Sequence, residues 1–421
     1  MRILMLSWEY PPKSVGGLAP HVHGLAGELV RQGHEVHVVT QGDDQLPALD
    51  HDRGVVVHRI QANSIWSLDF IGGIHQLNFV FLEKAMTLPS QYGPFDIVHA
   101  HDWLVAFAGR ALKNAWEVPM IATIHATEWG RHNGLHTDLQ RYISQIEWWL
   151  CYESWRVIVC SQAMQGELQR IFQVPADKLS VIPNGVHAED FRADKVSPDF
   201  NRNWYASDHE RILLYVGRLV WEKGIQVAIE AMPEILHTHP QVKLVIGGSG
   251  VQRGYLEALA RQRGVAHKVH FAGYLEHGPK VGLLRAAEVA LFPSLYEPFG
   301  IVALEAMASN TPVLVSDTGG LGEIIQHRVN GVKAHVNNPG SVAYQVRQLL
   351  SDDRLAHAVT KQAAKDVTQK YSWQAIARTT GQLYETVLQQ QPKTTVAANK
   401  SFLNLWPLGR TADQAVSRRR K

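Results

Sequence analysis

The chain has 421 residues. A chain of this length is longer than those that usually fold around a single hydrophobic core, so two domains are expected. Its composition, 45% apolar and 19% charged, is typical of a globular protein, and its formal net charge is only +2. No stretch reaches the ~18 consecutive apolar residues of a membrane span, so no integral membrane segment is expected. Two cysteines, Cys151 and Cys160, are too few for a disulfide framework and are expected to be buried thiols in a reducing compartment.

The charge is unevenly distributed along the chain. Residues 391–421 contain seven Lys or Arg residues and one Asp, a net charge of +6, which leaves −4 for residues 1–390. A mildly acidic body gives no electrostatic reason to bind nucleic acid, so no such partner is predicted. The basic tail lacks apolar periodicity. It is expected to be disordered and to act as a solubilising end rather than as a binder of polyanions.

The first half of the chain predicts strands alternating with helices. Residues 3–6 form an apolar run shorter than the ~7 residues of a secretory signal, which predicts a buried strand in a cytoplasmic protein. Residues 21–32 have helical apolar spacing and end at Gly33, and residues 35–40 form the next strand. This βαβ unit indicates a parallel sheet with right-handed crossovers. Further strands are predicted at 55–60, 96–99, 120–125 and 156–160, and helices at 104–115 and 139–152.

A second α/β series follows a polar segment without periodicity. Strands are predicted at 212–216, 243–247, 269–272, 289–292 and 312–316, and helices at 224–237, 254–263, 279–286 and 300–308. The predicted fold class is therefore α/β, with two facing, doubly wound parallel sheets of Rossmann type and a ligand cleft between them. The expected parts are domain 1–190, linker 191–210, domain 211–371, a helix at 372–390 that returns to the first domain, and the tail 391–421.

The segment from Glu297 to Glu305 has the strongest chemical signal. Pro298 favours a turn after the strand at 289–292, and an apolar helical run begins at Ile301. At 1.5 Å per residue the two glutamate backbones are roughly 12 Å apart, about the length of a nucleotide sugar. The free N–H groups of the helix start suit an anion between them. The spacing alone fits equally well a turn followed by a solvated helix glutamate.

Three glycine-rich turns follow other strands of this half. The first, residues 217–224, contains Arg218 and Lys223, which can converge on a diphosphate at the carboxyl end of the sheet. The second, residues 247–250, allows a backbone to approach a ligand closely, and the third spans residues 318–321. Together with the two glutamates, these turns predict a site for a nucleotide sugar.

The motifs together resemble the GT-B fold retaining glycosyltransferases of family GT4. The resemblance rests on Glu297-Pro-Phe-Gly with Glu305, on Gly217-Arg218 with Lys223-Gly224, and on Asn184-Gly185-Val186. Three N-terminal motifs resemble the branch close to glycogen and starch synthases. They are Lys13 with Gly16-Gly17-Leu18, His101-Asp102-Trp103-Leu104, and Thr123-Ile124-His125. The loop at Lys13 is one residue longer than the usual Lys-x-Gly-Gly-Leu, which puts the phosphate role of Lys13 in doubt.

The resemblance implies a role for each matching residue. Glu297 would hold donor-sugar hydroxyls, Glu305 the ribose, and Arg218 and Lys223 the diphosphate of the leaving nucleotide. His125, with Asp102 nearby, would lie beside the reacting centre. The implied donor-binding set is Gly16, Gly17, Arg218, Lys223, Gly248, Glu297, Phe299, Gly300, Ile301 and Glu305. The implied catalytic set is His125, Glu297, Arg218, Lys223 and Asp102.

The resemblance further implies transfer of a hexose, expected to be glucose from ADP-glucose or UDP-glucose, with retention of the α configuration and without a cofactor or required metal. Residues 127–134 follow His125 and read as a polar, aromatic loop. Trp129 could stack on a sugar and Arg131 could bind hydroxyls or a phosphate, or the loop could pack on the helix that contains Trp148 and Trp149. An α-1,4-glucan is the leading acceptor, and a sugar phosphate or a lipid-linked sugar is the alternative.

Metal-dependent chemistry is the first competing interpretation. Asp50-His51-Asp52 matches an Asp-x-Asp metal motif, but it is expected in a polar loop at 42–53 as a plain turn. His99 and His101, with Asp102 and His125, have a spacing that could bind a metal in a hydrolase. A hydrolase leaves the two glutamates and the basic turn unexplained.

Four other interpretations agree less well with the sequence. The glycines at 248, 250 and 254 miss the dinucleotide fingerprint by one position. A glycosidase needs carboxylates ~5–9.5 Å apart, closer than the helical estimate for Glu297 and Glu305. A sugar-nucleotide epimerase would share much of the donor site but would need no acceptor, so analysis of the product distinguishes it. A non-enzymatic glucan-binding protein would have no need of the complete donor set.

Overall fold

A computed structural model describes residues 1–61 and 69–390. The basic tail predicted at 391–421 lies outside the described residues. The described chain contains two β-sheets, each surrounded by helices, which confirms the predicted α/β class. Both cysteines are buried and unpaired, as expected. Among the described helices, none combines the length and the apolar character needed to cross a bilayer.

The N-terminal half contains an eight-stranded sheet in the order β3-β4-β2-β1-β5-β6-β7-β8. All neighbours are parallel except β3, which runs antiparallel to β4. The predicted strands are confirmed to within about two residues. The strands are β1 (Arg2–Ser7), β2 (Glu35–Gln41), β3 (Leu49–Asp52), β4 (Val55–Ile60), β5 (Ile97–His101), β6 (Met120–Ile124), β7 (Arg156–Val159) and β8 (Leu179–Val181).

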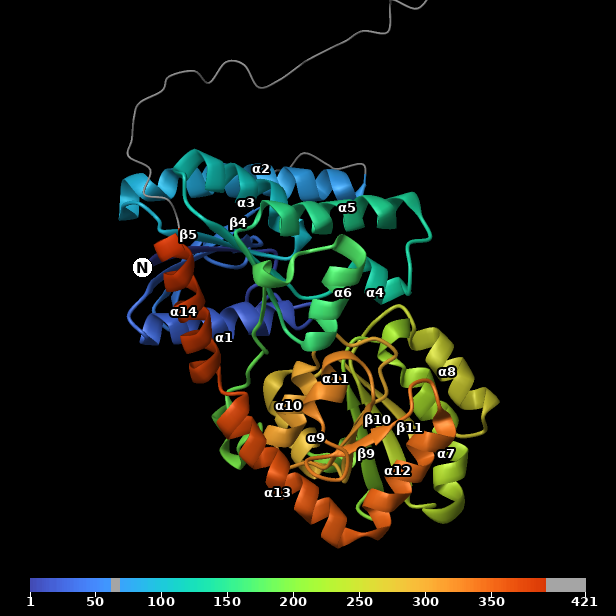
Figure 1. Ribbon diagram of the computed structural model, residues 1–421. Helices are drawn as coiled ribbons and strands as arrows, with labels where there is room; N and C mark the ends of the chain where they lie inside the picture. The colour runs from blue at the N-terminus through green and yellow to red at the C-terminus, as the bar shows by residue number, and fades with distance from the viewer. Residues whose placement is uncertain (62–68, 391–421) are drawn as a thin grey trace, which may run out of the picture. The chain divides into compact units, whose positions relative to one another are not determined.

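Helices cover both faces of this sheet (Figure 1). Alternate residues of β1 point to opposite sides: Ile3 and Met5 enter one apolar cluster, and Leu4 and Leu6 enter the other. Both faces are therefore buried, as is usual for a parallel sheet. Helices α1 (Leu18–Arg31) and α14 (Trp373–Gln390) contribute to the first cluster. The second contains residues of α2 (Phe70–Tyr92), α3 (Ala106–Trp116), α5 (Asp138–Glu153) and α6 (Gln162–Phe172).

The loop expected around Asp50-His51-Asp52 is wrong, because these residues form the edge strand β3. Antiparallel pairing with β4 satisfies the backbone of this polar segment. Asp50 forms an ion pair with Arg59 at 2.7 Å, and Asp52 accepts a hydrogen bond from the Tyr10 hydroxyl. The two carboxylates are thus bound to different protein partners.

The C-terminal half contains a six-stranded, wholly parallel sheet in the order β11-β10-β9-β12-β13-β14. Its strands are β9 (Arg211–Val216), β10 (Val242–Gly247), β11 (Val269–Gly273), β12 (Val289–Phe292), β13 (Val313–Ser316) and β14 (Val332–Ala334). Its helices are α7 (Ile225–Thr238), α8 (Arg253–Gln262), α9 (His277–Ala286), α10 (Ile301–Ala308), α11 (Gly319–Ile324), α12 (Pro339–Ser351) and α13 (Asp353–Lys370). The inner strands β9 and β12 are neighbours, so the turns that follow them meet at one edge of the sheet.

Helix α14 packs against the N-terminal sheet. The buried Trp373 lies against Gly24 and Gly185, where no side chain could fit beside the indole. Near the other end of the helix, the hydroxyl of Tyr384 is 2.6 Å from Nδ1 of His99 in β5. The predicted domain boundaries stay predictions.

Replacing Gly24 by Ala tests this packing. A Cβ at position 24 would overlap the indole of Trp373, so we expect Gly24→Ala to destabilise the fold by about 1–3 kcal/mol. Gly166→Ala is a matched control in helix α6, where a Cβ meets nothing within 4 Å. The control should gain up to about 1 kcal/mol from helix propensity. Urea denaturation of both variants measures the effect, and equal shifts would contradict the packing argument.

Candidate functional site

Glu297 lies in the turn between β12 and α10, and its side chain is buried. The ammonium of Lys223 donates to its Oε2 at 2.6 Å, and the hydroxyl of Ser294 donates to the same oxygen at 3.2 Å. The carbonyl of Glu297 accepts a hydrogen bond from the N–H of Gly320, which belongs to the third glycine turn. Two of the predicted glycine turns therefore contact the turn of Glu297, one at its carboxylate and one at its backbone carbonyl.

Glycines at this edge are required by the fold itself. Gly224 has a φ of 68°, and a Cβ there would collide with the carbonyl of Pro293. Gly248 has a φ of 139°, and its Cβ would collide with the carbonyl of Gly217. Only glycine tolerates both the backbone angle and the contact. The glycine turns thus bring the backbones after β9, β10 and β12 into direct contact.

Glu305 projects from α10 and has a partner that the sequence did not reveal. Lys280, in helix α9, donates to both carboxylate oxygens at 2.9 Å. Arg218 is held more loosely, 3.4 Å from Glu222, and its side chain is 41% exposed. Arg218 is therefore the predicted diphosphate ligand with the most freedom to turn toward a bound anion.

The glycine loop of the N-terminal half lies against two of the predicted donor residues. A Cβ at Gly16 would be 3.9 Å from Nε of Arg218, and one at Gly17 would be 3.5 Å from Cδ1 of Ile301. Glu9, which lies in none of the predicted motifs, holds this loop by accepting hydrogen bonds from the N–H groups of residues 15 and 16 at 2.7 and 3.3 Å. Lys13 is partly buried, and desolvation lowers the pKa of its ammonium.

Phe299 and Gly300 complete the turn before α10. Phe299 is buried, and Gly300 has a φ of 108°, which disfavours any residue with a side chain. The eight-residue helix α10 starts directly after Gly300 at Ile301. The predicted donor residues of the C-terminal half therefore lie in the turns and helices at the carboxyl end of its sheet.

Asp102 and His125 follow the neighbouring strands β5 and β6 and contact each other. Asp102 Oδ1 accepts a hydrogen bond from the backbone N–H of His125 at 2.7 Å. The backbone of Asp102 has φ 63° and ψ 171°, a strained combination for a residue with a side chain. Burial raises the pKa of the Asp102 carboxyl to about 6, although Arg131 opposes the shift. Burial, together with Arg131, lowers the pKa of His125 to about 3, so its imidazole is neutral at pH 7.

The loop predicted at 127–134 is wrong in part, because it contains the short helix α4 (Glu128–His132). Thr127 caps the helix by accepting a hydrogen bond from the N–H of Gly130. Helix α4 packs on α5, and the guanidinium of Arg170 lies 4.9 Å from the ring centroid of Trp129. The carboxyls of Asp102 and Glu147 raise the pKa of Arg131, although burial opposes this. One face of the Trp129 ring is thus covered by Arg170, and the guanidinium of Arg131 already interacts with carboxyl groups of the protein.

The histidines near Asp102 are arranged differently from the metal cluster considered as a competing interpretation of the sequence. Both ring nitrogens of His99 have hydrogen-bond partners, the hydroxyls of Tyr384 and Thr123 at 2.6 and 2.7 Å. His101 Nδ1 lies 3.3 Å from His125 Nε2. His21 of α1, which the sequence analysis did not select, lies beside both, with ring centroids 5.3 and 4.6 Å away. Nothing in the local sequence of α1 links His21 to this cluster.

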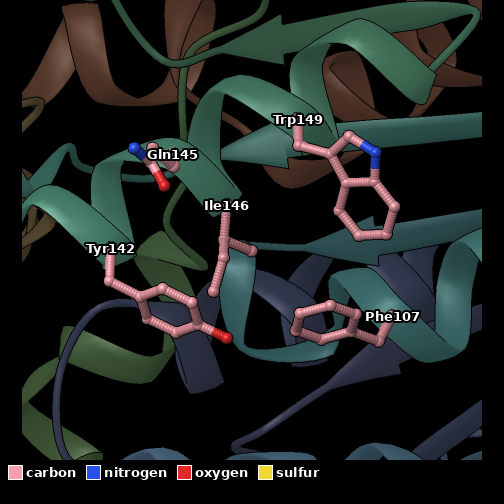
Figure 2. A pocket seen from close by; sticks show the side chains of 5 residues that line it. All are labelled: Phe107, Tyr142, Gln145, Ile146 and Trp149. Atoms are coloured by element: carbon pink, nitrogen blue, oxygen red, sulfur yellow. The ribbon is translucent and has the colours of Figure 1, made fainter. Parts of the chain in front are cut away.

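A separate groove of about 230 Å³ lies between α3 and α5. Its lining residues are Phe107, Tyr142, Gln145, Ile146 and Trp149. Figure 2 shows the three aromatic rings arranged around Ile146. None of the predicted site residues lines this groove.

The variant Asp102→Asn tests whether burial raises the pKa of the Asp102 carboxyl. The folded-state pKa is raised from 3.8 to about 6, so between these values the native state binds more protons than the unfolded chain. This group therefore favours folding at low pH, and that contribution is lost as the pH rises through 6. The stability of wild type relative to Asp102→Asn should fall between about pH 4 and pH 6 in urea denaturation. A difference that is constant over this range would contradict the assigned burial.

Comparisons with known proteins cover nearly the whole described chain. The model for Glycosyltransferase Family 4 matches residues 15–190, and that for Glycosyl transferases group 1 matches residues 198–366. A glycosyltransferase of Methanocaldococcus jannaschii is 42% identical over 92% of this chain and 99% of that protein. Glycogen synthase of Mycobacterium tuberculosis is 37% identical over 91% and 94% of the two chains.

The solved structure of sucrose-phosphate synthase from Thermosynechococcus elongatus superimposes with a TM-score of 0.78, at 26% identity, over 93% of this chain and 100% of that one. The chain belongs to glycosyltransferase family 4, with the GT-B fold, and is a hexosyltransferase.

Proposed function

We propose that the chain is a retaining α-glycosyltransferase that moves glucose from ADP-glucose or UDP-glucose to the end of an α-1,4-glucan, in the cytoplasm. The observation that carries the proposal is the buried Glu297 carboxylate with Lys223 and Ser294, in a turn that two glycine turns contact. The 37% identity to a glycogen synthase favours the glucan acceptor. Two unpaired, buried cysteines fit a reducing compartment.

In this proposal the ion pairs at the carboxyl end of the C-terminal sheet exchange partners when the nucleotide sugar binds. Lys223 contacts Glu297, and Arg218 contacts Glu222. A diphosphate brings charge that both cations can bind, which leaves Glu297 free to accept hydrogen bonds from the sugar hydroxyls. Glu305, with Lys280 beside it, binds the ribose. The N–H groups of Phe299 and Gly300 contact the sugar from the start of α10.

Transfer then takes place on one face of the sugar. The bond from C1 to the phosphate oxygen breaks, the bond from C1 to the acceptor hydroxyl oxygen forms, and the hydroxyl proton passes to the departing phosphate oxygen. Arg218 and Lys223 stabilise the charge on that phosphate. His125, neutral at pH 7 because burial lowers its pKa, acts as a hydrogen-bonding partner of the sugar rather than as a proton donor. No protein nucleophile and no metal ion takes part.

A sugar phosphate is the second candidate acceptor. The observation in its favour is a family relative, the D-inositol 3-phosphate glycosyltransferase of Corynebacterium jeikeium, which is 28% identical over 91% of this chain. Arg131, the cation available on the acceptor side, argues against it, because the carboxyls of Asp102 and Glu147 already surround this guanidinium. A lipid-linked sugar acceptor and a sugar-nucleotide epimerase are the remaining alternatives, in that order.

A donor-by-acceptor screen tests the proposal. ADP-glucose and UDP-glucose are each incubated with glycogen, maltose or glucose 1-phosphate, and nucleotide release, product linkage and anomeric configuration are measured. We expect α-1,4 extension of glycogen or maltose, with activity retained in EDTA. Transfer only to glucose 1-phosphate would replace the glucan by a sugar phosphate. A changed nucleotide sugar in the absence of acceptor would indicate an epimerase, and a β-linked product would contradict retention.

A further inference from the structure

Three histidines from separate parts of the N-terminal half converge on one point. His21 lies in α1, His101 ends β5, and His125 follows β6. One ring nitrogen of each can be chosen so that all three lie within 4.8 Å of one another. One pair, His101 Nδ1 and His125 Nε2, is 3.3 Å apart. Tetrahedral binding of an ion with metal–nitrogen bonds of about 2.0–2.1 Å requires nitrogens about 3.3 Å apart, so small movements of the rings would close the set.

The hydrogen bond of His21 orients its free nitrogen. Its Nδ1 is 2.7 Å from Oδ1 of Asn184, and because an amide oxygen only accepts, Nδ1 carries the proton. The lone pair is therefore on Nε2, which is buried and has no hydrogen-bond partner. A histidine whose second ring nitrogen donates to a protein oxygen is the usual arrangement of a metal ligand.

His101 also has a buried nitrogen without a partner, Nε2. A buried polar atom left without a hydrogen bond costs about 1–3 kcal/mol, so the free Nε2 of His21 requires an explanation. In His101 it is Nδ1 that lies near His125, and Nε2 is on the other side of that ring. The ring centroid of the neighbouring His99 is 4.1 Å from that of His101. Both ring nitrogens of His99 have hydrogen-bond partners, the hydroxyls of Tyr384 and Thr123. The partnerless Nε2 of His21 is therefore the unsatisfied atom that a bound ion would account for.

The three-histidine set is accessible from one side, and both acidic and basic side chains surround it. His125 is partly exposed, whereas His21 and His101 are buried, so an ion could enter past His125 and keep one open position there. Arg131 is the nearby cation, and the carboxyls of Asp102, Glu128 and Glu147 lie around it. Acidic side chains therefore lie close to the guanidinium, and the surroundings do not exclude a divalent cation.

We propose that His21, His101 and His125 bind one divalent transition-metal ion of borderline softness, such as Zn²⁺ or Co²⁺. Three imidazoles are a ligand set that suits these ions and leaves a fourth position open. The proposal goes beyond the proposed function, in which transfer needs no metal. An ion on His125 occupies a nitrogen that would otherwise face the sugar, so the bound metal inhibits transfer.

Titration of the full chain with Co²⁺, after treatment with EDTA and its removal, tests binding independently of activity. We expect one Co²⁺ per chain with the intense visible absorption of a tetrahedral site. His21→Asn and His101→Asn should each weaken binding at least about 10-fold, the smallest loss seen when even an outer partner of a metal ligand is removed. His75→Asn is the matched control, an exposed histidine that contacts Tyr142 and should leave binding unchanged.

If His21→Asn fails to fold, Asn184→Ala replaces it, because loss of the orienting amide should weaken Co²⁺ binding about 10–100-fold. Absence of stoichiometric binding, or equal affinity in wild type, His21→Asn and His101→Asn, overturns the site. Added Zn²⁺ should inhibit transfer by the wild type, and EDTA should reverse the inhibition. If transfer requires the metal, the proposed inhibitory role of the ion is wrong. If the acceptor screen fails, only the proposed function is contradicted, because Co²⁺ binding is measured without any substrate.

Discussion

Glu297→Gln should lower kcat/KM for transfer by about 100- to 1,000-fold, the loss expected when one preorganised polar group is removed from an active site. The substitution keeps the shape of the side chain but removes the charge that accepts hydrogen bonds from Lys223 and Ser294. An amide binds sugar hydroxyls more weakly than a carboxylate, because charge-assisted hydrogen bonds are about twice as strong. Steady-state kinetics with the donor and acceptor identified in the screen measure the effect.

Glu288→Gln is the matched control for this substitution. Glu288 belongs to the same half and pairs with Arg211 near the surface, with its side chain 45% exposed. Exposed pairs contribute little, so the control should keep both its activity and its stability. Both variants should retain the wild-type circular dichroism spectrum. Near-normal turnover in Glu297→Gln would overturn the assignment of the donor site.

Lys223→Ala should raise the dissociation constant of the nucleoside diphosphate by about 10- to 100-fold. A hydrogen bond between charged groups contributes about 1.5–3 kcal/mol, and 1.4 kcal/mol corresponds to a factor of ten. Isothermal titration calorimetry with ADP and UDP measures this change. Lys370→Ala, which removes an ammonium paired with Asp366 on α13, is the control and should bind as wild type does.

Combination of Lys223→Ala with Glu297→Gln examines the contact between the two side chains. The ammonium and the carboxylate are 2.6 Å apart, so each single change leaves the other group without its partner. The effects of the two changes on stability should therefore not add, as is usual for residues in contact. Unchanged nucleotide affinity in Lys223→Ala, or strict additivity in the double variant, would contradict the proposed role of the pair.

Local sequence patterns predicted much of the fold. The strand expected at residues 55–60 has the same bounds as β4, and most other strands agree to within about two residues. Short runs of apolar residues that end at glycines indicated these strands, because a strand is buried only if its own residues are apolar. The elements that were not predicted include helix α2 and the edge strand β3, together with α6, β8, β14, α12 and α13. Helix α2 has apolar residues on more than one side, and β3 is polar and depends on β4 for its pairing.

The sequence by itself determined the fold class, the family and the turns that contain Arg218, Lys223 and Glu297. Only the tertiary structure decided which side chains contact each other: Lys223 and Glu297 are 74 residues apart in the chain, and Lys280 and Glu305 are 25 apart. Such pairs depend on the order of strands in the sheet, which local periodicity does not encode. The shifted pKa values of Asp102 and His125 likewise arise from burial by distant segments. Strand and turn signals act over a few residues, whereas ion pairing and desolvation depend on the whole fold.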